Sequence, residues 1–359
     1  MTNTPETHNA PHPTPSTGPY AGLGAWTVTD CEQAWLAFAG STESAGSPVA
    51  ELARAVADDR RLLTAITQVG DALPNLWLAV TRLKGAPLTR GYGPWRDWLV
   101  ERWTGVTETM RHRAVQTNEV NRCTYLTPAL SLISQQHGTT PLAVIEVGAS
   151  AGLLLNLNRY RHAYNIADIG IIATGPSESR VTASCTAAGP VPVPNEPPRL
   201  AWRAGLDPHP LNARDQTDTA WLATVSAWPG QTERLDRLRE ALTIAREQPP
   251  FLIRGGVEHL RAVAAQAPSE LPLVVIDVGV ARYLSPAQRT TYAHEIRDVL
   301  GAHHISADIP TYLPQPLHPG QPDNWPEPPD PLTFIITLNG KPQAMADLNG
   351  HHLYWHDDR

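Results

Sequence analysis

The stretch that most constrains this chain is Pro141–Tyr160, which reads PLAVIEVGASAGLLLNLNRY. Leu142–Val147 is a short apolar run rich in β-branched residues, which predicts a buried strand. Gly148–Gly152 follows as a glycine-containing turn, and the leucines after it predict the start of a helix. Glycine lets the backbone approach a ligand, and the unpaired N–H groups at a helix start point outward. The stretch therefore predicts a strand–turn–helix unit that can hold a ligand.

This unit resembles the cofactor turn of class I S-adenosylmethionine (SAM)-dependent methyltransferases. Those enzymes carry an acidic residue at the end of the first strand and then a G-x-G-x-G-like turn. The residues that carry the resemblance, and that it implies as SAM-binding residues, are Glu146, Gly148, Ala149, Ser150 and Gly152. Ser150 stands at the position of the middle glycine.

Two other interpretations of the turn stay open at this point. The same letters fit the G-x-S-x-G nucleophile elbow, in which Ser150 would be an acylated nucleophile. A tight turn that binds nothing also fits, because matches over five residues arise by chance.

Length and composition exclude several classes of protein. The chain has 359 residues and 42% hydrophobic content, enough for one large α/β domain with additions, or for two domains. A net charge of −7 argues against a nucleic-acid partner, and no run of 18 apolar residues predicts a membrane span. Three isolated cysteines and scattered histidines predict a cytoplasmic protein without a metal site.

Shifts in composition along the chain predict its domain organisation. Residues 1–20 are rich in Thr and Pro, which predicts a disordered tail rather than a signal peptide. Residues 21–137 have helical periodicity and predict an N-terminal helical cap, and residues 138–359 predict a Rossmann-like domain. Residues 165–198 read as an insertion in that domain, in which Ile169–Ala173 and Val181–Cys185 are expected to pair as a hairpin.

A dense polar block precedes the glycine-rich stretch. We predict a helix over Arg113–Gln136, in which Asn118 and Arg122 share a face. A helix that leads into the first strand would have its N-terminal half beside the ligand end of the sheet. We therefore expect Asn118 and Arg122 to contact the ligand, with Glu119 pairing with Arg122 or acting as a base. A solvated helix face is the alternative.

Asp207 ends a predicted strand, Arg199–Leu206, and is the candidate ribose ligand, because a carboxylate accepts hydrogen bonds from both hydroxyls of a diol. It lies 61 residues after Glu146, whereas the usual spacing is about 20 residues, so the insertion must account for the excess. Asp168 has the more usual spacing and is the rival candidate.

The C-terminal half predicts more strands of a buried sheet. Leu271–Val280 is a continuous apolar run typical of a parallel strand covered on both faces, and Asp277 stands near its carboxyl end. Asn339-Gly340 and Asn349-Gly350 lie between alternating segments and predict an antiparallel meander. A parallel series that finishes with antiparallel strands favours the methyltransferase arrangement over a dehydrogenase.

The hydrolase interpretation fits this organisation less well. Ser150, Asp277 and either His303 or His304 do follow in the order of an α/β-hydrolase triad. However, the region before Pro141 reads as helical and lacks the strands that precede a nucleophile elbow.

A joint set of motifs resembles a bacterial family catalogued as domain of unknown function 2332. The motifs are T-N-E-V with Arg122, E-V-G-A-S-A-G-L, R-x-G-x-D-x-x-P-L at Arg203–Leu211, W-P at Trp228 before R-L at Arg237, and Y-L-S-P-x-x-R at Tyr283–Arg289. The resemblance covers nearly the whole chain after the tail. It implies an α/β, Rossmann-like class I methyltransferase fold behind the helical cap.

The chain also departs from that family pattern. The family usually has an acid after the third strand, where this chain has Gly256, so recognition of adenine is in question. Asp277 stands where the family tends to have His.

The function that follows is a SAM-binding enzyme that transfers a methyl group to a small molecule. A base is needed only where the nucleophile carries a proton, and Glu119, Asp277 and Tyr283 are the candidates. Intramolecular cyclisation or elimination that releases methylthioadenosine is one alternative, and a non-catalytic binding protein is another. Formation of a homodimer is compatible with the sequence.

Overall fold

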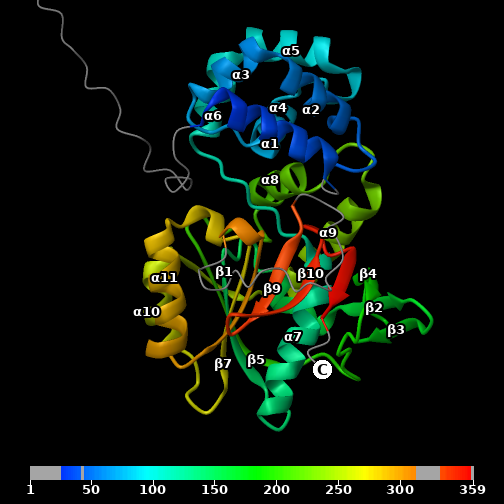
Figure 1. Cartoon of the computed structure of the whole chain (residues 1–359), viewed down its shortest axis with the longest axis vertical. Helices are drawn as coiled ribbons and strands as arrows, with labels where there is room; N and C mark the ends of the chain where they lie inside the picture. Colours follow the sequence, from blue (N-terminus) through cyan, green and yellow to red (C-terminus); the bar gives the residue numbers. More distant parts are fainter. Residues whose placement is uncertain (1–25, 42–43, 313–331, 357–359) are drawn as a thin grey trace, which may run out of the picture.

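The computed structural model describes residues 26–41, 44–312 and 332–356. The predicted tail, residues 1–20, lies outside the described residues. The chain is a mixed α/β protein in which N-terminal helices form a cap above a domain built on one large sheet (Figure 1). None of the described helices is long and apolar enough to cross a membrane.

The cap is an all-helical unit whose helices begin at recognisable signals. Thr27 caps the first helix in a capping box with Asp30, and Pro74 stands in the first turn of the fourth. Trp35, Trp77 and Trp95 are fully buried and fill the cap core. The cap helices are α1 (Val28–Gly40), α2 (Val49–Asp58), α3 (Arg60–Thr67), α4 (Pro74–Leu83), η1 (Leu88–Arg90), α5 (Tyr92–Glu101) and α6 (Trp103–Met110).

Eleven strands form a single sheet in the order β3-β2-β4-β11-β10-β9-β8-β7-β1-β5-β6. Their bounds are β1 (Leu142–Val147), β2 (Arg161–Ile166), β3 (Gly170–Thr174), β4 (Thr182–Ala188), β5 (Leu200–Asp207), β6 (Phe251–Arg254), β7 (Leu273–Val278), β8 (His303–Asp308), β9 (Phe334–Leu338), β10 (Lys341–Ala346) and β11 (His352–Trp355). The predicted strand Leu142–Val147 is confirmed residue for residue as β1.

The strands β6-β5-β1-β7-β8 are all parallel, and β9 then runs antiparallel beside β8. From β1 the chain first builds β5 on one side and later β7 on the other, so β1 lies at the point where the strand order reverses. Ligands in open α/β sheets bind at the carboxyl ends of strands at such a point. The meander β9-β10-β11 is confirmed as antiparallel, with Asn339 and Gly340 at positive φ in its first turn.

Helices cover both faces of the sheet. Val144 of β1 belongs to the larger apolar cluster, which continues into α7 and the cap, and Ile145 belongs to the cluster under α10 and α11. The remaining helices are η2 (Val120–Arg122), α7 (Cys123–Gln136), η3 (Leu154–Arg159), α8 (Gln216–Ser226), α9 (Thr232–Glu247), η4 (Val257–His259), α10 (Leu260–Ala264), η5 (Ala281–Tyr283), α11 (Pro286–His294), η6 (Glu295–Val299) and η7 (Pro310–Tyr312).

Two sets of contacts cross the boundary expected between the cap and the sheet domain at residue 137. The helical cap was expected to reach residue 137, but α7 packs against β2, β4 and β8 of the sheet, because its buried residues face them. In the other direction, α8 packs on α4, and Arg82 of the cap donates to the carbonyls of Thr224 and Ala227. The cap is therefore fastened to the sheet domain through α8.

The predicted insertion, residues 165–198, is part of the main sheet. The hairpin expected between Ile169–Ala173 and Val181–Cys185 is wrong, because β3 pairs with β2 and β4 pairs in parallel with β2 and β11. The helix expected to start after the glycine turn begins at Leu154 but is short. Only the six-residue 3-10 helix η3 follows, and the chain then enters β2 directly at Arg161.

Candidate functional site

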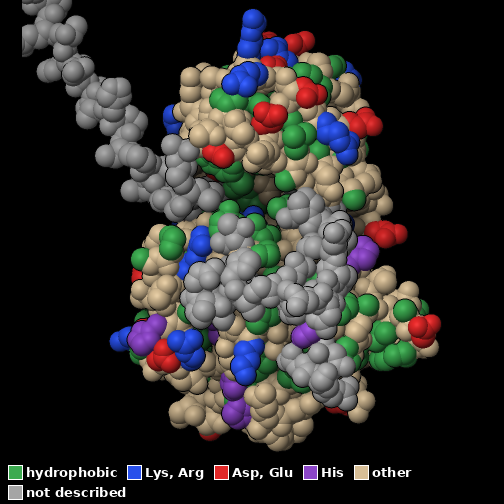
Figure 2. Space-filling view, viewed as in Figure 1, with side chains coloured by type: hydrophobic (Ala, Val, Ile, Leu, Met, Phe, Trp, Pro, Cys, Tyr) green, Lys and Arg blue, Asp and Glu red, His purple; other side chains and the backbone are tan. Residues whose placement is uncertain are grey.

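A pocket of about 260 Å³ lies where the carboxyl ends of four parallel strands meet the cap. Gly148 follows β1, Asp207 ends β5, Gly256 follows β6 and Gly279 follows β7, and all four line the pocket. Asn75 of the cap lines it from the other side. On the face shown in Figure 2, the surface is hollowed between the cap and the sheet domain. The pocket thus occupies the switch point beside β1, where an α/β sheet binds its ligand.

The glycine-rich turn after β1 comes close to the pocket because its backbone is left-handed at three positions. Gly148 has φ 73°, Ser150 has φ 51° and Gly152 has φ 67°. A Cβ added at Gly148 would lie 2.7 Å from Cγ2 of Val280, so only glycine fits there. Gly148 and Ser150 line the pocket. Gly152 is turned away from it, since an added Cβ would meet Pro250 at 2.5 Å.

Asp207 joins this turn to the end of β5. Its Oδ2 accepts from the main-chain N–H of Ser150 over 2.8 Å, and its Oδ1 accepts from the N–H of His209 over 2.7 Å. The Gln116 side chain donates to Oδ1 over a longer 3.4 Å. Burial raises the pKa of Asp207 despite these bonds. Asp168, the rival candidate, is exposed in the turn between β2 and β3 and does not line the pocket.

Asn118 holds the glycine turn rather than pointing into the pocket. Its Nδ2 donates to the carbonyl of Ala149 over 3.0 Å, and its Oδ1 accepts from the N–H of Leu153 over 3.0 Å. The side chain is buried and, like Ala149, is not part of the pocket lining. The polar block therefore does contact the glycine turn, as a brace for its backbone.

The polar block is not helical as predicted. Residues 114–119 are non-helical and lead into η2, because polar side chains here bond to backbone groups and compete with a helix. Asn118 bonds to the turn, and Glu119 accepts from the N–H of Asn121 over 3.0 Å.

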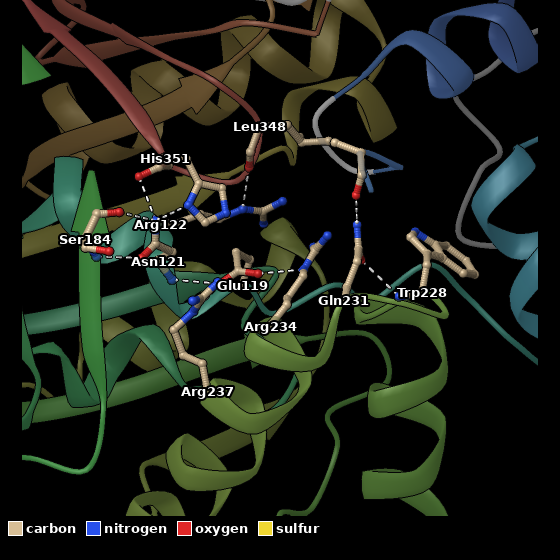
Figure 3. A network of polar contacts seen from close by, with 12 residues as sticks. Glu119, Asn121, Arg122, Ser184, Trp228, Gln231, Arg234, Arg237, Leu348 and His351 are labelled. Carbon is tan, nitrogen blue, oxygen red and sulfur yellow. Dashed lines mark hydrogen bonds and ion pairs between the residues drawn. The ribbon is translucent and has the colours of Figure 1, made fainter. Parts of the chain in front are cut away.

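Glu119 belongs to a buried ion-pair network in Figure 3. Its carboxylate lies 2.7 Å from Nε of Arg234 and 3.2 Å from Nε of Arg237, both on α9. The pairing expected with Arg122 is wrong. Burial alone would raise the pKa of Glu119, but Arg237 and Arg234 lower the pKa to about 2. Glu119 does not line the pocket, so the arrangement ties α9 to η2 and holds this carboxylate outside the pocket lining.

Arg122 faces the pocket from the start of α7. The side chain is only 6% exposed, and its Nε donates to the carbonyl of Leu348 over 3.0 Å (Figure 3). The guanidinium carbon lies 5.9 Å from the centre of the Phe334 ring. All three residues line the pocket, so they form one wall, which we call the Arg122 wall.

Glu146 of β1 is buried on the opposite side of its strand from Ile145 and does not line the pocket. Its Oε2 has no hydrogen-bond partner among the described residues. Burial raises the pKa of Glu146 well above its usual value and Asp207 raises it further, whereas Arg122 lowers it. These effects together favour the neutral form of the Glu146 carboxyl.

Asp277 and Tyr283, the other two catalytic candidates, lie in different places. Asp277 is buried outside the pocket lining, where its carboxylate accepts from the Ser306 hydroxyl over 2.7 Å and lies 2.6 Å from Nε2 of His304. The Tyr292 hydroxyl donates to it as well, over 3.2 Å. Tyr283 lines the pocket at the end of η5.

Sequence reasoning missed several lining residues, of which Glu258 matters most. Glu258 follows Gly256 by two residues, accepts from the N–H of Gly256 over 3.2 Å and lines the pocket. The signal was a carboxylate just beyond the point where the family pattern has its acid. Gln116, Arg282 and Phe334 were also missed. Phe334 belongs to a strand more than 180 residues from β1 in sequence, so nothing local places it there.

The surroundings of Ser150 differ from those expected of a nucleophile elbow. The Ser150 hydroxyl donates to the carbonyl of Gln116 over 3.1 Å. His304 pairs with Asp277, and His303 contacts His137. The pocket lining that contains Ser150 includes neither of these histidines nor Asp277. In the described part of the chain, the three residues of the proposed triad are therefore not brought together.

Metal ligands do not cluster in the described part of the chain, where no group of three His, Cys, Asp or Glu side chains could hold an ion. The cysteines Cys31, Cys123 and Cys185 are buried and free.

Comparison with known proteins gives one match. A family model described as an uncharacterized protein conserved in bacteria, DUF2332, matches residues 32–311. No curated protein and no solved structure matches the chain. The matched range holds most of the cap and the parallel strands that form the pocket. Because the match covers more than three quarters of the chain, the protein belongs to the bacterial DUF2332 family.

Proposed function

We propose that this protein binds SAM in the pocket beside β1 and transfers its methyl group to a small molecule. The observation that carries the proposal is the hydrogen bond from the Ser150 N–H to Asp207. It places a strand-end carboxylate, suited to a ribose diol, directly against a left-handed glycine-rich turn on the neighbouring parallel strand.

The order of the strands supports a Rossmann-like class I methyltransferase fold. In order of sequence within the parallel part, β6-β5-β1-β7-β8 is a 3-2-1-4-5 arrangement, and an antiparallel strand follows beside the fifth. Two features differ from that fold. The helix after the first strand is reduced to η3, and the sheet continues beyond β9 through five more strands.

A binding pose follows from the residues that line the pocket. The ribose would lie at Asp207, whose carboxylate has about four acceptor sites and uses three of them within the protein. The long contact from Gln116 is the one that a ribose hydroxyl would replace. Adenine would lie over the loop after β6, with Glu258 accepting from its amino group in place of the missing acid at Gly256. The methionine part would then cross Gly148.

The volume is compatible with a small ligand. A cavity of about 260 Å³ is close to the lower end of the range for ligand pockets, about 300–1,000 Å³. The lining combines backbone of the turn with a few polar groups, as ligand sites usually do.

Methyl transfer from SAM requires few catalytic groups from the protein. The sulfonium is already activated, so the pocket supplies positioning of an in-line attack. Tyr283 is the base candidate that lines the pocket, and it would serve where the nucleophile carries a proton. Glu119 and Asp277 are engaged elsewhere and are not part of this proposal.

One observation keeps a hydrolase as the second candidate. Ser150 has φ 51°, and a strained serine on a turn after a strand is also the geometry of a nucleophile elbow. Ser150→Ala separates the two, because loss of this hydroxyl abolishes ester hydrolysis but leaves SAM-dependent activity largely intact.

Incubation of the purified protein with SAM and a panel of small-molecule acceptors, followed by mass spectrometry, tests the proposal. Methyl transfer predicts S-adenosylhomocysteine and an acceptor heavier by one methyl group. Methylthioadenosine as the product would instead indicate cyclisation or elimination of SAM itself. Consumption of an ester substrate that depends on Ser150, with SAM unchanged, would establish the hydrolase.

A further inference from the structure

Arg122 is a buried cation whose charge is not balanced by the described protein. It is 6% exposed and forms no ion pair among the described residues. Its Nε bonds to a neutral carbonyl, that of Leu348, and its guanidinium lies over the neutral ring of Phe334. Burying a guanidinium without a counter-charge is costly. The cost suggests that the counter-charge arrives with a ligand.

Two acids near Arg122, Glu146 and Glu119, do not supply that charge. Glu146 is close enough for Arg122 to affect its titration, yet its Oε2 is unpartnered and its environment favours the neutral carboxyl. Glu119, three residues earlier, is held by Arg234 and Arg237 (Figure 3).

The other pocket arginine is in a different situation. Arg282 lines the pocket as well, but its Nη2 lies 3.8 Å from Oδ1 of the buried Asp308. Among the described lining residues, Arg122 is therefore the cation without a carboxylate partner.

We propose that Arg122 binds a carboxylate group of the ligand that fills this pocket. A guanidinium presents parallel N–H groups that match the two oxygens of a carboxylate. One unpaired cation balances the single charge of a carboxylate better than the double charge of a phosphate. The Arg122 wall, with Phe334 and Leu348, then gives the carboxylate-bearing part of the ligand an apolar surrounding.

This inference rests on the proposed function for the origin of the carboxylate, which has two sources. It belongs either to the aminobutyrate end of SAM or to the acceptor. S-adenosylhomocysteine carries the aminobutyrate carboxylate and methylthioadenosine does not, so this pair reports on the first source. Acetate, pyruvate and benzoate, added in the presence of S-adenosylhomocysteine, report on the second.

The test compares wild type, Arg122→Gln and Arg122→Lys by calorimetry and thermal unfolding. We expect Arg122→Gln to lose about tenfold to 150-fold in affinity for the carboxylate-bearing ligand, the range for one charge-assisted hydrogen bond. Arg122→Lys keeps the positive charge but lacks the parallel N–H groups of the guanidinium, so we expect a smaller loss of affinity. Arg54→Gln is a surface control, since the exposed Arg54 also donates to a main-chain carbonyl, that of Ala39, but lies in the cap outside the pocket lining.

The outcomes separate this proposal from the proposed function. Loss of the preference for S-adenosylhomocysteine over methylthioadenosine in Arg122→Gln assigns the cofactor carboxylate. Loss of stabilisation by the small acids alone assigns the acceptor. Stabilisation of wild type by the acids without binding of either nucleoside would support Arg122 while refuting SAM. Equal binding of every probe by Arg122→Gln and wild type would overturn the proposal. The thermal unfolding midpoint without ligand could also be much lower in Arg122→Gln than in Arg54→Gln while ligand affinity is unchanged. That result would show a structural role for Arg122 instead.

Discussion

The main-chain N–H of Ser150 donates to Oδ2 of Asp207 over 2.8 Å, across two neighbouring parallel strands. This bond fixes the glycine-rich turn after β1 to the end of β5. The same carboxylate anchors the following loop through the N–H of His209. Asp207 therefore shapes the pocket as well as lining it, and a change at this position acts on both.

Asp207→Asn is expected to weaken binding of S-adenosylhomocysteine by about tenfold to 150-fold. The amide keeps one acceptor oxygen but loses the charge that strengthens a bond to a ribose hydroxyl. Calorimetry on the folded variant measures the change. Asp168→Asn is the matched control, because Asp168 is exposed and away from the pocket, and Asn tolerates its φ of 64°. Equal effects of the two substitutions would refute the assignment of the ribose site.

Gly148→Ala is expected to destabilise the protein and to weaken ligand binding. Its φ of 73° is strained for alanine, at about 1–2 kcal/mol, and its Cβ would overlap Val280, at about 1–3 kcal/mol more. Gly85→Ala isolates the strain, since φ is 87° there and an added Cβ meets nothing within 4 Å. Urea unfolding compares the two. Adding Val280→Ala should restore part of the loss at Gly148, and a Gly148→Ala variant no less stable than Gly85→Ala would contradict the close approach.

Glu119→Gln is expected to lower the free energy of unfolding at pH 7 by about 3–5 kcal/mol, because it leaves Arg234 and Arg237 buried without their counter-charge. In wild type the pKa of Glu119 is lowered to about 2 from 4.5. The stabilisation from the ionised carboxylate is therefore present above about pH 4.5 and is lost as the pH falls toward 2.

The pH dependence gives this prediction a second readout. The stability gap between wild type and Glu119→Gln should narrow by about 1 kcal/mol from pH 7 to pH 4, and further below that. Glu247→Gln is the control, because Glu247 also pairs with two arginines, Arg159 and Arg180, but in an exposed position. We expect it to change stability little. A Glu119→Gln variant that is stable but inactive would restore Glu119 as a catalytic base.

Asp277→Asn is expected to reduce stability by about 1.5–3 kcal/mol while leaving affinity for S-adenosylhomocysteine unchanged. The carboxylate accepts from the hydroxyls of Ser306 and Tyr292 and lies beside His304, outside the pocket lining. An amide can satisfy only part of this set. Denaturation and calorimetry on the same preparation distinguish the effects. A stable variant that has lost ligand binding would place Asp277 in the site after all.

The part of the fold carried by local patterns was predictable. Leu142–Val147 became β1 because a continuous apolar run suits a strand covered on both faces, and Asn339-Gly340 became a hairpin turn because both residues tolerate positive φ. The strand partners of β4 were not predictable, since β2 and β11 flank it through long-range parallel pairing that leaves no local signature.

The candidate site was predictable to a similar extent. Gly148, Ser150 and Asp207 line the pocket as the motif suggested, and they do so on neighbouring strands. The sequence could not show that Glu119 pairs with residues other than Arg122, because its partners on α9 lie more than 110 residues away. A still longer separation in sequence, more than 200 residues, hid the Arg122 wall, whose other members come from the C-terminal meander.

Titration of the wild-type protein with S-adenosylhomocysteine in a calorimeter is the most direct examination of SAM binding. We predict saturable binding of one molecule per chain, weakened tenfold or more by Asp207→Asn and unaffected by Asp168→Asn. Absence of heat with both S-adenosylhomocysteine and SAM at millimolar concentration, in a sample that unfolds cooperatively, would contradict the proposal. Tighter binding of a phosphate-bearing dinucleotide than of S-adenosylhomocysteine would contradict it equally.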